Sequence, residues 1–237
     1  MKQRTNLRFA RFLILCLIFV NGCSYKKENI EPSNGGGGQN ETVTDIDGNV
    51  YHTAKIGNQV WMAENLNVSR FRNGDSIPQA KSTEEWQRAG ENEQPAWCFY
   101  NNDPANGGIN GKLYNWYCVI DARGLAPEGW HIPSMDEGSR LAFFLGGWAV
   151  AGDQLKSTSG WYKNGNGNNE SGFNAKAGGY RDCYYGSCAY LGLYGYWWSS
   201  TLAGRFNAIH FKLTFNGSQV LRKYDNTMNG FSVRCLK

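Results

Sequence analysis

Residues 206–224 read FNAIHFKLTFNGSQVLRKY and carry the clearest structural signal in the chain. Side chains of two kinds alternate along Phe206–Phe215, and a period of two is typical of a β-strand with two different faces. Asn216–Gly217 follows, a dipeptide that favours a tight turn because both residues tolerate positive φ angles. The sequence therefore predicts a hairpin whose second strand is Ser218–Tyr224. One face of the first strand carries Ile209, Phe211, Leu213 and Phe215, and the other carries Ala208, His210, Lys212 and Thr214.

Shorter patterns predict further strands on both sides of this hairpin. Phe231–Cys235 alternates again and is expected to form the last strand. Near the start of the folded sequence, residues 43–56 contain Asp47–Gly48 and predict a hairpin with a tight turn. A second turn is expected at Gly57–Asn58, and a short strand is expected at Trp130–Ile132.

Two helices are predicted from capping boxes, in which a serine and a glutamate three residues later satisfy each other's backbone donors. The boxes are Ser82–Glu85 and Ser134–Glu137. The second helix contains Gly138, which costs about 1 kcal/mol relative to alanine, so this helix must depend on tertiary packing. Its expected buried face consists of Leu141, Phe144 and Leu145. Leu113–Ile120 fits a helix or a strand, with the helix favoured.

The segment Asn164–Ser200 is rich in Gly, Asn, Tyr and Trp and is expected to be a long loop-dominated insert. Long ordered loops tend to carry function, and aromatic faces beside amide and hydroxyl groups suit sugar rings. The candidate ligand-binding residues are Tyr184, Tyr185, Tyr190, Trp197 and Trp198. The alternative is that these aromatics pack the loops together, which is favoured for the two tryptophans because large aromatic side chains dominate core burial.

The charge pattern argues against a nucleic-acid partner. The chain has 24 Lys and Arg against 20 Asp and Glu, but four of the basic residues lie among the first 22 residues, which contain no acid. The rest of the chain therefore carries 20 charges of each sign. Binding to DNA or RNA needs clustered excess positive charge, so no such partner is expected.

The N-terminus has the order of a secretory signal peptide, with basic residues up to Arg11 and then the apolar stretch Phe12–Val20. This stretch is too short to span a bilayer. Val20–Cys23 resembles the bacterial lipobox, which implies cleavage before Cys23 and attachment of lipid to it. Several acyl chains on one residue anchor a protein firmly to a membrane. The alternative is an ordinary cleaved signal peptide with an incidental cysteine.

The residues after Cys23 include four consecutive glycines and show no apolar periodicity, which is typical of a flexible tether. The sequence therefore predicts three regions: a signal peptide at 1–22, a tether at 23–42 and one domain at 43–237. The expected location is the cell envelope, through a lipid anchor in the outer membrane that faces the periplasm or the surface.

Five cysteines lie in the predicted domain: Cys98, Cys118, Cys183, Cys188 and Cys235. Exported chains favour disulfides. Cys183 and Cys188 are closest in sequence and are predicted to pair, which would rigidify the tyrosine-rich loop. The odd number leaves at least one free thiol or an intermolecular bond.

Motifs for catalysis or metal binding are missing from the sequence. None of the three histidines lies in an H-E-x-x-H pattern, and no nucleophile elbow, P-loop or dinucleotide fingerprint occurs. Asp45 and Asp47 favour a turn over a calcium loop, because the glycine follows at once and no later glutamate completes the loop. No catalytic residue, metal or cofactor is therefore assigned.

Eight ordered motifs resemble the Fibrobacter succinogenes major paralogous domain family over nearly the whole chain after the tether. They are Ile56–Asn67, Tyr100–Asp103, Gly111–Trp116, Pro127–Ser134, Ser171–Ala175, Gly178–Arg181, Trp198–Thr201 and Gly230–Cys235. One departure is Ala126, which stands where the family often has a cysteine before Pro-x-Gly-Trp. Any family disulfide that uses this position is missing or rewired here.

The resemblance implies an α+β, C-type lectin-like fold, with a small twisted antiparallel sheet, flanking short helices and long ordered loops. It also implies a secreted or lipid-anchored protein, and it implies no particular molecular activity. The favoured hypothesis is a cell-envelope protein that binds a glycan or a protein of the envelope or the host. The alternatives are a structural or interaction domain without a small-molecule ligand and, third, an enzyme of the formylglycine-generating type. The calcium motifs of lectins are missing, since Trp198 is followed by Ser199–Ser200.

Overall fold

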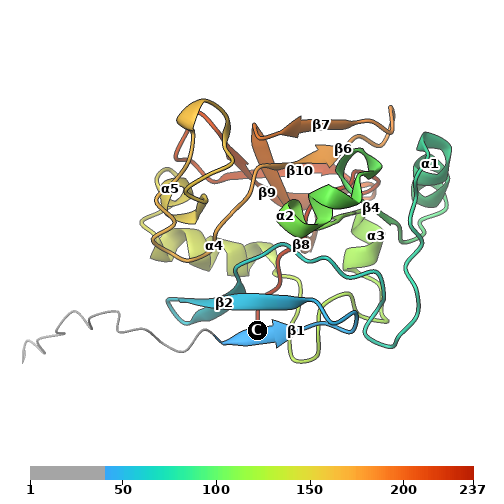
Figure 1. Cartoon of the computed structure of the whole chain (residues 1–237), viewed down its shortest axis with the longest axis horizontal. Helices are drawn as coiled ribbons and strands as arrows, with labels where there is room; N and C mark the ends of the chain where they lie inside the picture. Colours follow the sequence, from blue (N-terminus) through green and yellow to red (C-terminus); the bar gives the residue numbers. More distant parts are fainter. Residues whose placement is uncertain (1–40) are drawn as a thin grey trace, which may run out of the picture. The chain divides into compact units, whose positions relative to one another are not determined.

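A five-stranded sheet in the order β10-β9-β8-β6-β7 is the largest element of the computed structural model, which describes residues 41–237 (Figure 1). Its strands are β6 (Gly178–Arg181), β7 (Cys188–Leu191), β8 (Tyr194–Leu202), β9 (Asn207–Thr214) and β10 (Leu221–Asn226). Neighbouring strands are antiparallel except β6 and β8, which run parallel. The class is α+β, as predicted.

This sheet corrects the prediction that Asn164–Ser200 is an insert dominated by loops. The segment supplies β6, β7 and most of β8, three of the five strands. Glycines hid the strands from a composition argument, because glycine is depleted in most strands. Here it is required: Gly179 pairs with Gly195, and a Cβ on Gly179 would lie 2.4 Å from the Ala189 carbonyl oxygen.

The predicted C-terminal hairpin is confirmed as β9 and β10, but its tight turn is wrong. Lys212 pairs with Leu221, so the connection is much longer than Asn216–Gly217. Phe215 and Val220 leave the ladder because they pack into the core, and their N–H groups donate to the carbonyls of Leu193 and Trp148. Burial of these two side chains outweighs the local turn preference.

A second sheet contains β1 (Thr42–Thr44), β2 (Val50–Ile56) and β3 (Gln59–Met62) in that order. The two-residue turn at Gly57–Asn58 is confirmed, since Ile56 pairs with Gln59. The first hairpin also forms, but Thr44 pairs with Val50 and leaves a five-residue connection. The Asp45 carboxylate accepts hydrogen bonds from the N–H groups of Asp47 and Asn49 in that connection and fixes its shape.

Both capping boxes form and begin α1 (Thr83–Glu91) and α4 (Met135–Phe144). Leu113–Ile120 contains both expected structures, first the strand β5 (Leu113–Tyr114) and then the helix α3 (Trp116–Val119). Strand β5 pairs with β4 (Trp97–Cys98). The remaining short helices are α2 (Gly107–Asn110) and α5 (Ala151–Leu155), with 3-10 turns η1 (Tyr100–Asn102), η2 (Pro104–Asn106) and η3 (Tyr162–Asn164). Within residues 41–237 no helix has the length and apolarity needed to cross a membrane.

Helix α4 packs against β8 and β9, and Gly138 makes this contact close. A Cβ on Gly138 would lie 1.9 Å from Phe211 Cζ, so the residue that weakens the helix is the one that lets it approach the sheet. The predicted buried face is partly wrong. Leu141 and Leu145 are buried, whereas Phe144 is 64% exposed.

Two predicted strands form single bridges instead of ladders. In Phe231–Cys235, Phe231 bridges to Tyr114 and Ser232 bridges to Trp197. In Trp130–Ile132, only His131 forms a bridge, to Leu236. Residues 231–235 are buried and run through the core, so their neighbours are several short segments and not one long strand.

Two apolar clusters cover opposite faces of the five-stranded sheet. The first contains Trp198 and Ala208 together with Phe231, and the second contains Trp197 and Leu213 together with α4 and α5. Both clusters also reach the N-terminal sheet, which lies across α3 and α4 from the five-stranded sheet (Figure 1). Alternate residues of β8 and β9 therefore point into different clusters, and one end of the first face stays uncovered.

The predicted signal peptide, most of the tether and the lipid-attachment residue Cys23 lie outside the described residues.

Candidate functional site

The uncovered end of the sheet forms an open groove of about 690 Å³, within the range of small-molecule sites. We call it the sheet groove. Its aromatic lining is Tyr180, Tyr184, Tyr196, Phe206, Tyr224 and Phe231. Its polar lining is Asp182, Asn207, His210, Lys212, Lys223, Asp225, Asn226 and Asn229. Aromatic and polar side chains thus share one concave surface.

Strand register brings these side chains together. Tyr196 pairs with Lys212, and His210 pairs with Lys223, so all four lie on the same face of β8, β9 and β10. Tyr180 of β6 joins them, since its ring centroid lies 5.2 Å from that of Tyr196. The face of β9 that carries His210 and Lys212, expected from the sequence to be the less apolar face, therefore forms the floor of the groove.

His210 and Asp225 form a hydrogen-bonded pair in the floor, with 2.9 Å between Nε2 and Oδ2. The other ring nitrogen of His210 lies 3.4 Å from the Phe211 carbonyl oxygen, and the His210 side chain is only 1% exposed while that of Asp225 is 47% exposed. The pair therefore holds the Asp225 carboxylate in the groove floor.

A group of stacked tyrosines borders the floor. Tyr190 stacks on Tyr180 with 5.8 Å between centroids, and Tyr194 lies 4.9 Å from Tyr190. The Lys212 ammonium lies 3.9 Å from the Tyr194 centroid and 5.0 Å from the Tyr196 centroid. A cation over an aromatic face is attracted by the ring quadrupole, so Lys212 is held across the groove floor.

Burial shifts the pKa of each of these groups in the direction that favours its neutral form. Burial raises the pKa of Tyr180 and of Tyr196, so both phenols keep their protons near neutral pH. Burial lowers the pKa of Lys212, while the Asp225 carboxylate acts in the opposite direction. The groove therefore offers neutral hydroxyl donors beside ionic groups of both signs.

The loop between β6 and β7 carries Tyr184 and Tyr185. Asp182 holds this loop, because its Oδ1 accepts hydrogen bonds of 2.8 Å from the N–H groups of both tyrosines. Tyr184 is 68% exposed and lines the groove. Tyr185 is 79% exposed but lies outside the lining. Tyr190 is 45% exposed and stands beside the groove through its stack on Tyr180.

Trp197 and Trp198 are not surface residues, which corrects their assignment as ligand contacts. They are 4% and 0% exposed. Trp197 Nε1 donates to Asn65 Oδ1 at 2.8 Å, and Trp198 Nε1 donates to the Tyr114 carbonyl at 2.9 Å. Both indoles are therefore core residues with satisfied donors, as the packing alternative predicts.

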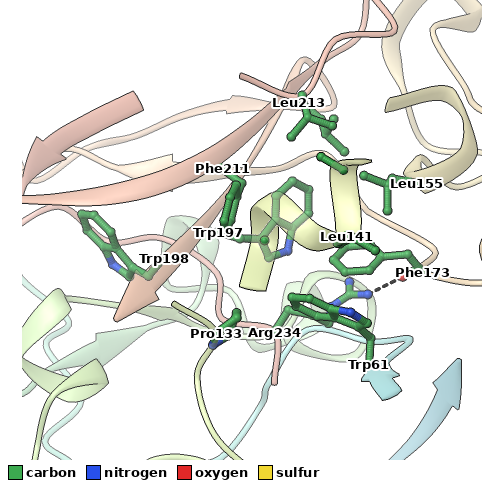
Figure 2. A pocket seen from close by; sticks show the side chains of 13 residues that line it. Trp61, Pro133, Leu141, Leu155, Phe173, Trp197, Trp198, Phe211, Leu213 and Arg234 are labelled. Carbon is green, nitrogen blue, oxygen red and sulfur yellow. Dashed lines mark hydrogen bonds between the residues drawn. The ribbon is translucent and has the colours of Figure 1, made fainter. Parts of the chain in front are cut away.

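An apolar cavity beside Trp197 is too small to be a ligand site. Its volume is about 30 Å³, enough for about one water molecule. Figure 2 shows that Trp61, Phe173 and Leu141 form its walls, with the Arg234 guanidinium among them.

The five cysteines of the described residues carry free thiols, so the predicted Cys183–Cys188 disulfide is not formed in the structure. The two thiols have different neighbours. Cys183 is 1% exposed, and its N–H donates to Asn229. Cys188 pairs with Arg181 in the strand ladder and packs against the cluster that contains Cys98. The predicted pairing is therefore not confirmed by the structure.

Several groove residues were not among the sequence-based candidates: Tyr180, His210, Lys212, Lys223, Tyr224 and Asp225. For His210 and Lys212 the signal was the alternation along β9, which marks a face with polar side chains but cannot say whether that face is open. Within residues 41–237 no group of three or more His, Cys, Asp or Glu side chains is arranged to hold a metal ion.

A comparison with protein-family models matches residues 54–237 to the Fibrobacter succinogenes major domain. The chain belongs to this family. The matched range contains every residue of the sheet groove. No curated protein and no solved structure matches the chain.

Motifs that resemble the Fibrobacter succinogenes major domain mostly build the scaffold of the structure. Gly178–Arg181 is β6, Trp198–Thr201 lies in β8, and Gly230–Cys235 is buried in the core. Tyr184, Tyr185 and Tyr190 lie outside these motifs. The family match therefore accounts for the fold of this chain, and function must be argued from the groove itself.

Proposed function

We propose that the protein is a lipid-anchored protein of the cell envelope whose domain binds a carbohydrate in the sheet groove. The observation that carries the proposal is the combination of exposed tyrosines at the rim with hydrogen-bonding groups in the floor. Tyr184 is 68% exposed and lines the groove, and Tyr190 is 45% exposed and stacks on Tyr180 of the lining. Asp225 and Lys212 lie in the groove floor, held by His210 and by Tyr194.

A sugar ring fits this arrangement chemically. Its C–H faces pack on aromatic rings, and its hydroxyls both donate and accept hydrogen bonds. Carboxylates accept, ammonium groups donate, and asparagine side chains do both. Lys212 and Lys223 are balanced by Asp182 and Asp225 in the lining, so the groove favours a neutral saccharide over a strongly charged one.

The binding proposal is tested by the double variant Tyr184→Ala with Tyr190→Ala. We expect the purified protein to bind at least one saccharide on a glycan array, with calcium and with chelator alike. The double variant should bind that saccharide about tenfold more weakly by calorimetry. The reason is that each lost aromatic contact is worth about 0.5–1.5 kcal/mol, and 1.4 kcal/mol corresponds to tenfold in affinity.

Tyr162→Ala is the matched control, because Tyr162 is 50% exposed and lies outside the groove. Its affinity for the saccharide should equal that of the wild-type protein. Silence across polysaccharides and host glycans would contradict the proposal, as would equal losses in the double variant and the control. A domain that interacts only with envelope proteins is the second candidate, and the burial of Trp197 and Trp198 favours it by removing two aromatics from the surface.

The lipid anchor rests on the leader sequence and on Cys23. Expressed in a Gram-negative bacterium and fed an alkyne-labelled fatty acid, the wild-type chain should incorporate the label and sediment with membranes. Cys23→Ser should lose the label, because the thiol that accepts the lipid is gone, and Cys183→Ser should retain it. Label in the Cys23→Ser protein would contradict lipid attachment at this residue.

We also propose that the fold is C-type lectin-like. Support comes from the twisted sheet with flanking short helices and from the C-terminus, where Leu236 bridges to Trp61 of β3 and so meets the N-terminal sheet.

A further inference from the structure

Two cysteines that are 90 positions apart in the sequence, Cys98 and Cys188, meet beside the sheet groove. Cys98 ends β4 and is 0% exposed, whereas Cys188 begins β7 and is partly exposed. Cys188 packs against the buried cluster that contains Cys98. The Asn101 N–H also donates to Cys188 Sγ, at 3.2 Å. Cys188 is therefore the more accessible of the two cysteines, and Cys98 is fully buried.

The surroundings of the two thiols give them different reactivity. The hydrogen bond from Cys98, followed by the Asn101 N–H and the Arg181 charge, lowers the pKa of Cys188 to about 7 against the effect of burial. Burial raises the pKa of Cys98. Since the thiolate is the nucleophile, Cys188 reacts first near neutral pH. The nearby phenol of Tyr100 has a pKa raised mainly by its own burial, so it adds no charge here.

Arg181 is held in a fixed position beside Cys188, its partner in the strand ladder. Its guanidinium is held by hydrogen bonds of 2.7 Å to the carbonyls of Ala80 and Ser82, and its side chain is buried. It lies over the Trp86 ring, 4.8 Å from the centroid. Among the described salt bridges none involves Arg181, so no carboxylate neutralises the charge that stabilises the Cys188 thiolate.

We propose that Cys98 and Cys188 form a disulfide when the protein meets a small-molecule disulfide, with Cys188 as the attacking thiol. The Cys188 thiolate attacks one sulfur of the oxidant and releases one small thiol. Cys98 then loses its proton and attacks the Cys188 sulfur of the mixed disulfide, releasing the second small thiol. Two protein thiols are oxidised, and one small-molecule disulfide is reduced to two thiols.

The crosslink would fix the position of a strand next to the sheet groove. Tyr190 lies two residues after Cys188 on this edge strand, β7, and stacks on Tyr180 of the groove lining. A bond to Cys98 ties this edge strand to β4. An oxidising location depends on the proposed export of the protein, but the chemistry of the pair does not, so failure of one proposal leaves the other standing.

The test is peptide mapping of the purified protein after incubation with oxidised glutathione at pH 7.5. The expected product is a linked peptide pair that contains Cys98 and Cys188. Because the bond closes a long loop, oxidation should raise the melting temperature by about 5–10 °C in the wild-type protein. The same shift should appear in Cys183→Ser and should vanish in Cys98→Ser and Cys188→Ser.

The order of the two steps has its own readout. Alkylation of Cys188 by iodoacetamide in the reduced protein should be half-maximal near pH 7 and should move to higher pH in Cys98→Ala, which lacks the hydrogen-bond donor. A Cys183–Cys188 linkage, a persistent glutathione adduct on Cys188, or unchanged thiols under oxidant would each overturn the proposal. Mapping of the wild-type protein decides this even if a serine variant does not fold.

Discussion

Replacing Trp198 by alanine is expected to lower the free energy of unfolding by about 3–5 kcal/mol, the range for large aromatic side chains removed from a core. Trp198 is 0% exposed, and its ring centroid lies 4.2 Å from that of Phe231. Its indole N–H donates to the Tyr114 carbonyl at 2.9 Å. The substitution leaves a cavity between β8 and the buried C-terminal segment and removes one of the two donors to that carbonyl, the other being the Phe231 N–H. Urea denaturation followed by circular dichroism measures the loss.

Tyr185→Ala is the control for this experiment, since Tyr185 is 79% exposed. Its effect on the free energy of unfolding should stay within about 0.5 kcal/mol, as for most surface substitutions. The two variants together distinguish buried aromatic residues that stabilise the fold from exposed ones that do not. A Trp198→Ala protein with wild-type stability and lost saccharide binding would mean that Trp198 contacts the ligand, contrary to its position in the structure.

Replacing Arg234 by methionine is expected to cost about 3–5 kcal/mol, because it leaves buried carbonyl oxygens without a donor. Arg234 is 1% exposed. Its guanidinium donates to the carbonyls of Met62 and Phe173 and, at 2.6 Å from Nη2, to Asn65 Oδ1. Asn65 Oδ1 retains a donor in Trp197 Nε1, but the two carbonyls lose theirs. Figure 2 shows the guanidinium beside Phe173 and Trp61.

The environment of Arg234 explains why methionine is the informative replacement. Burial lowers the pKa of Arg234 to about 9, so the side chain is still charged at neutral pH despite its desolvation. Methionine has an unbranched, flexible chain and removes the charge, so the measured loss reports the hydrogen bonds more than the packing. Arg222→Met, at an exposed position of β10, should change stability by less than about 0.5 kcal/mol. Equal stability of the Arg234→Met and wild-type proteins would show that the arginine does not hold these segments together.

The elements predicted correctly are those whose signal is local. The capping boxes at Ser82 and Ser134 begin helices because each needs only two side chains and one turn of backbone. The turn at Gly57–Asn58 is equally local. The tight turn expected at Asn216–Gly217 failed because Phe215 and Val220 pack into the core, an interaction that no short window contains.

The candidate site was only partly predictable for the same reason. Tyr184 and Tyr190 were expected from the crowding of aromatics in one segment, and both are exposed at or beside the sheet groove. Trp197 and Trp198 belong to the same aromatic-rich segment but are buried. Neighbouring β8 residues point to opposite faces of the sheet, and both faces are covered at these two positions. Composition cannot distinguish an aromatic at the covered end of a strand from one at its open end.

The sequence by itself determined the class of the fold, its family, the two capped helices and the C-terminal hairpin, because these depend on periodicity, caps and ordered motifs. Only the tertiary structure decided which tyrosines meet Lys212 and Asp225, and which cysteine lies against Cys188. The groove combines β6, β8, β9 and β10, whose register is set by hydrogen bonds between segments far apart in the chain. Contacts between such distant segments form only when the whole domain packs around the sheet, so no short stretch of sequence contains them.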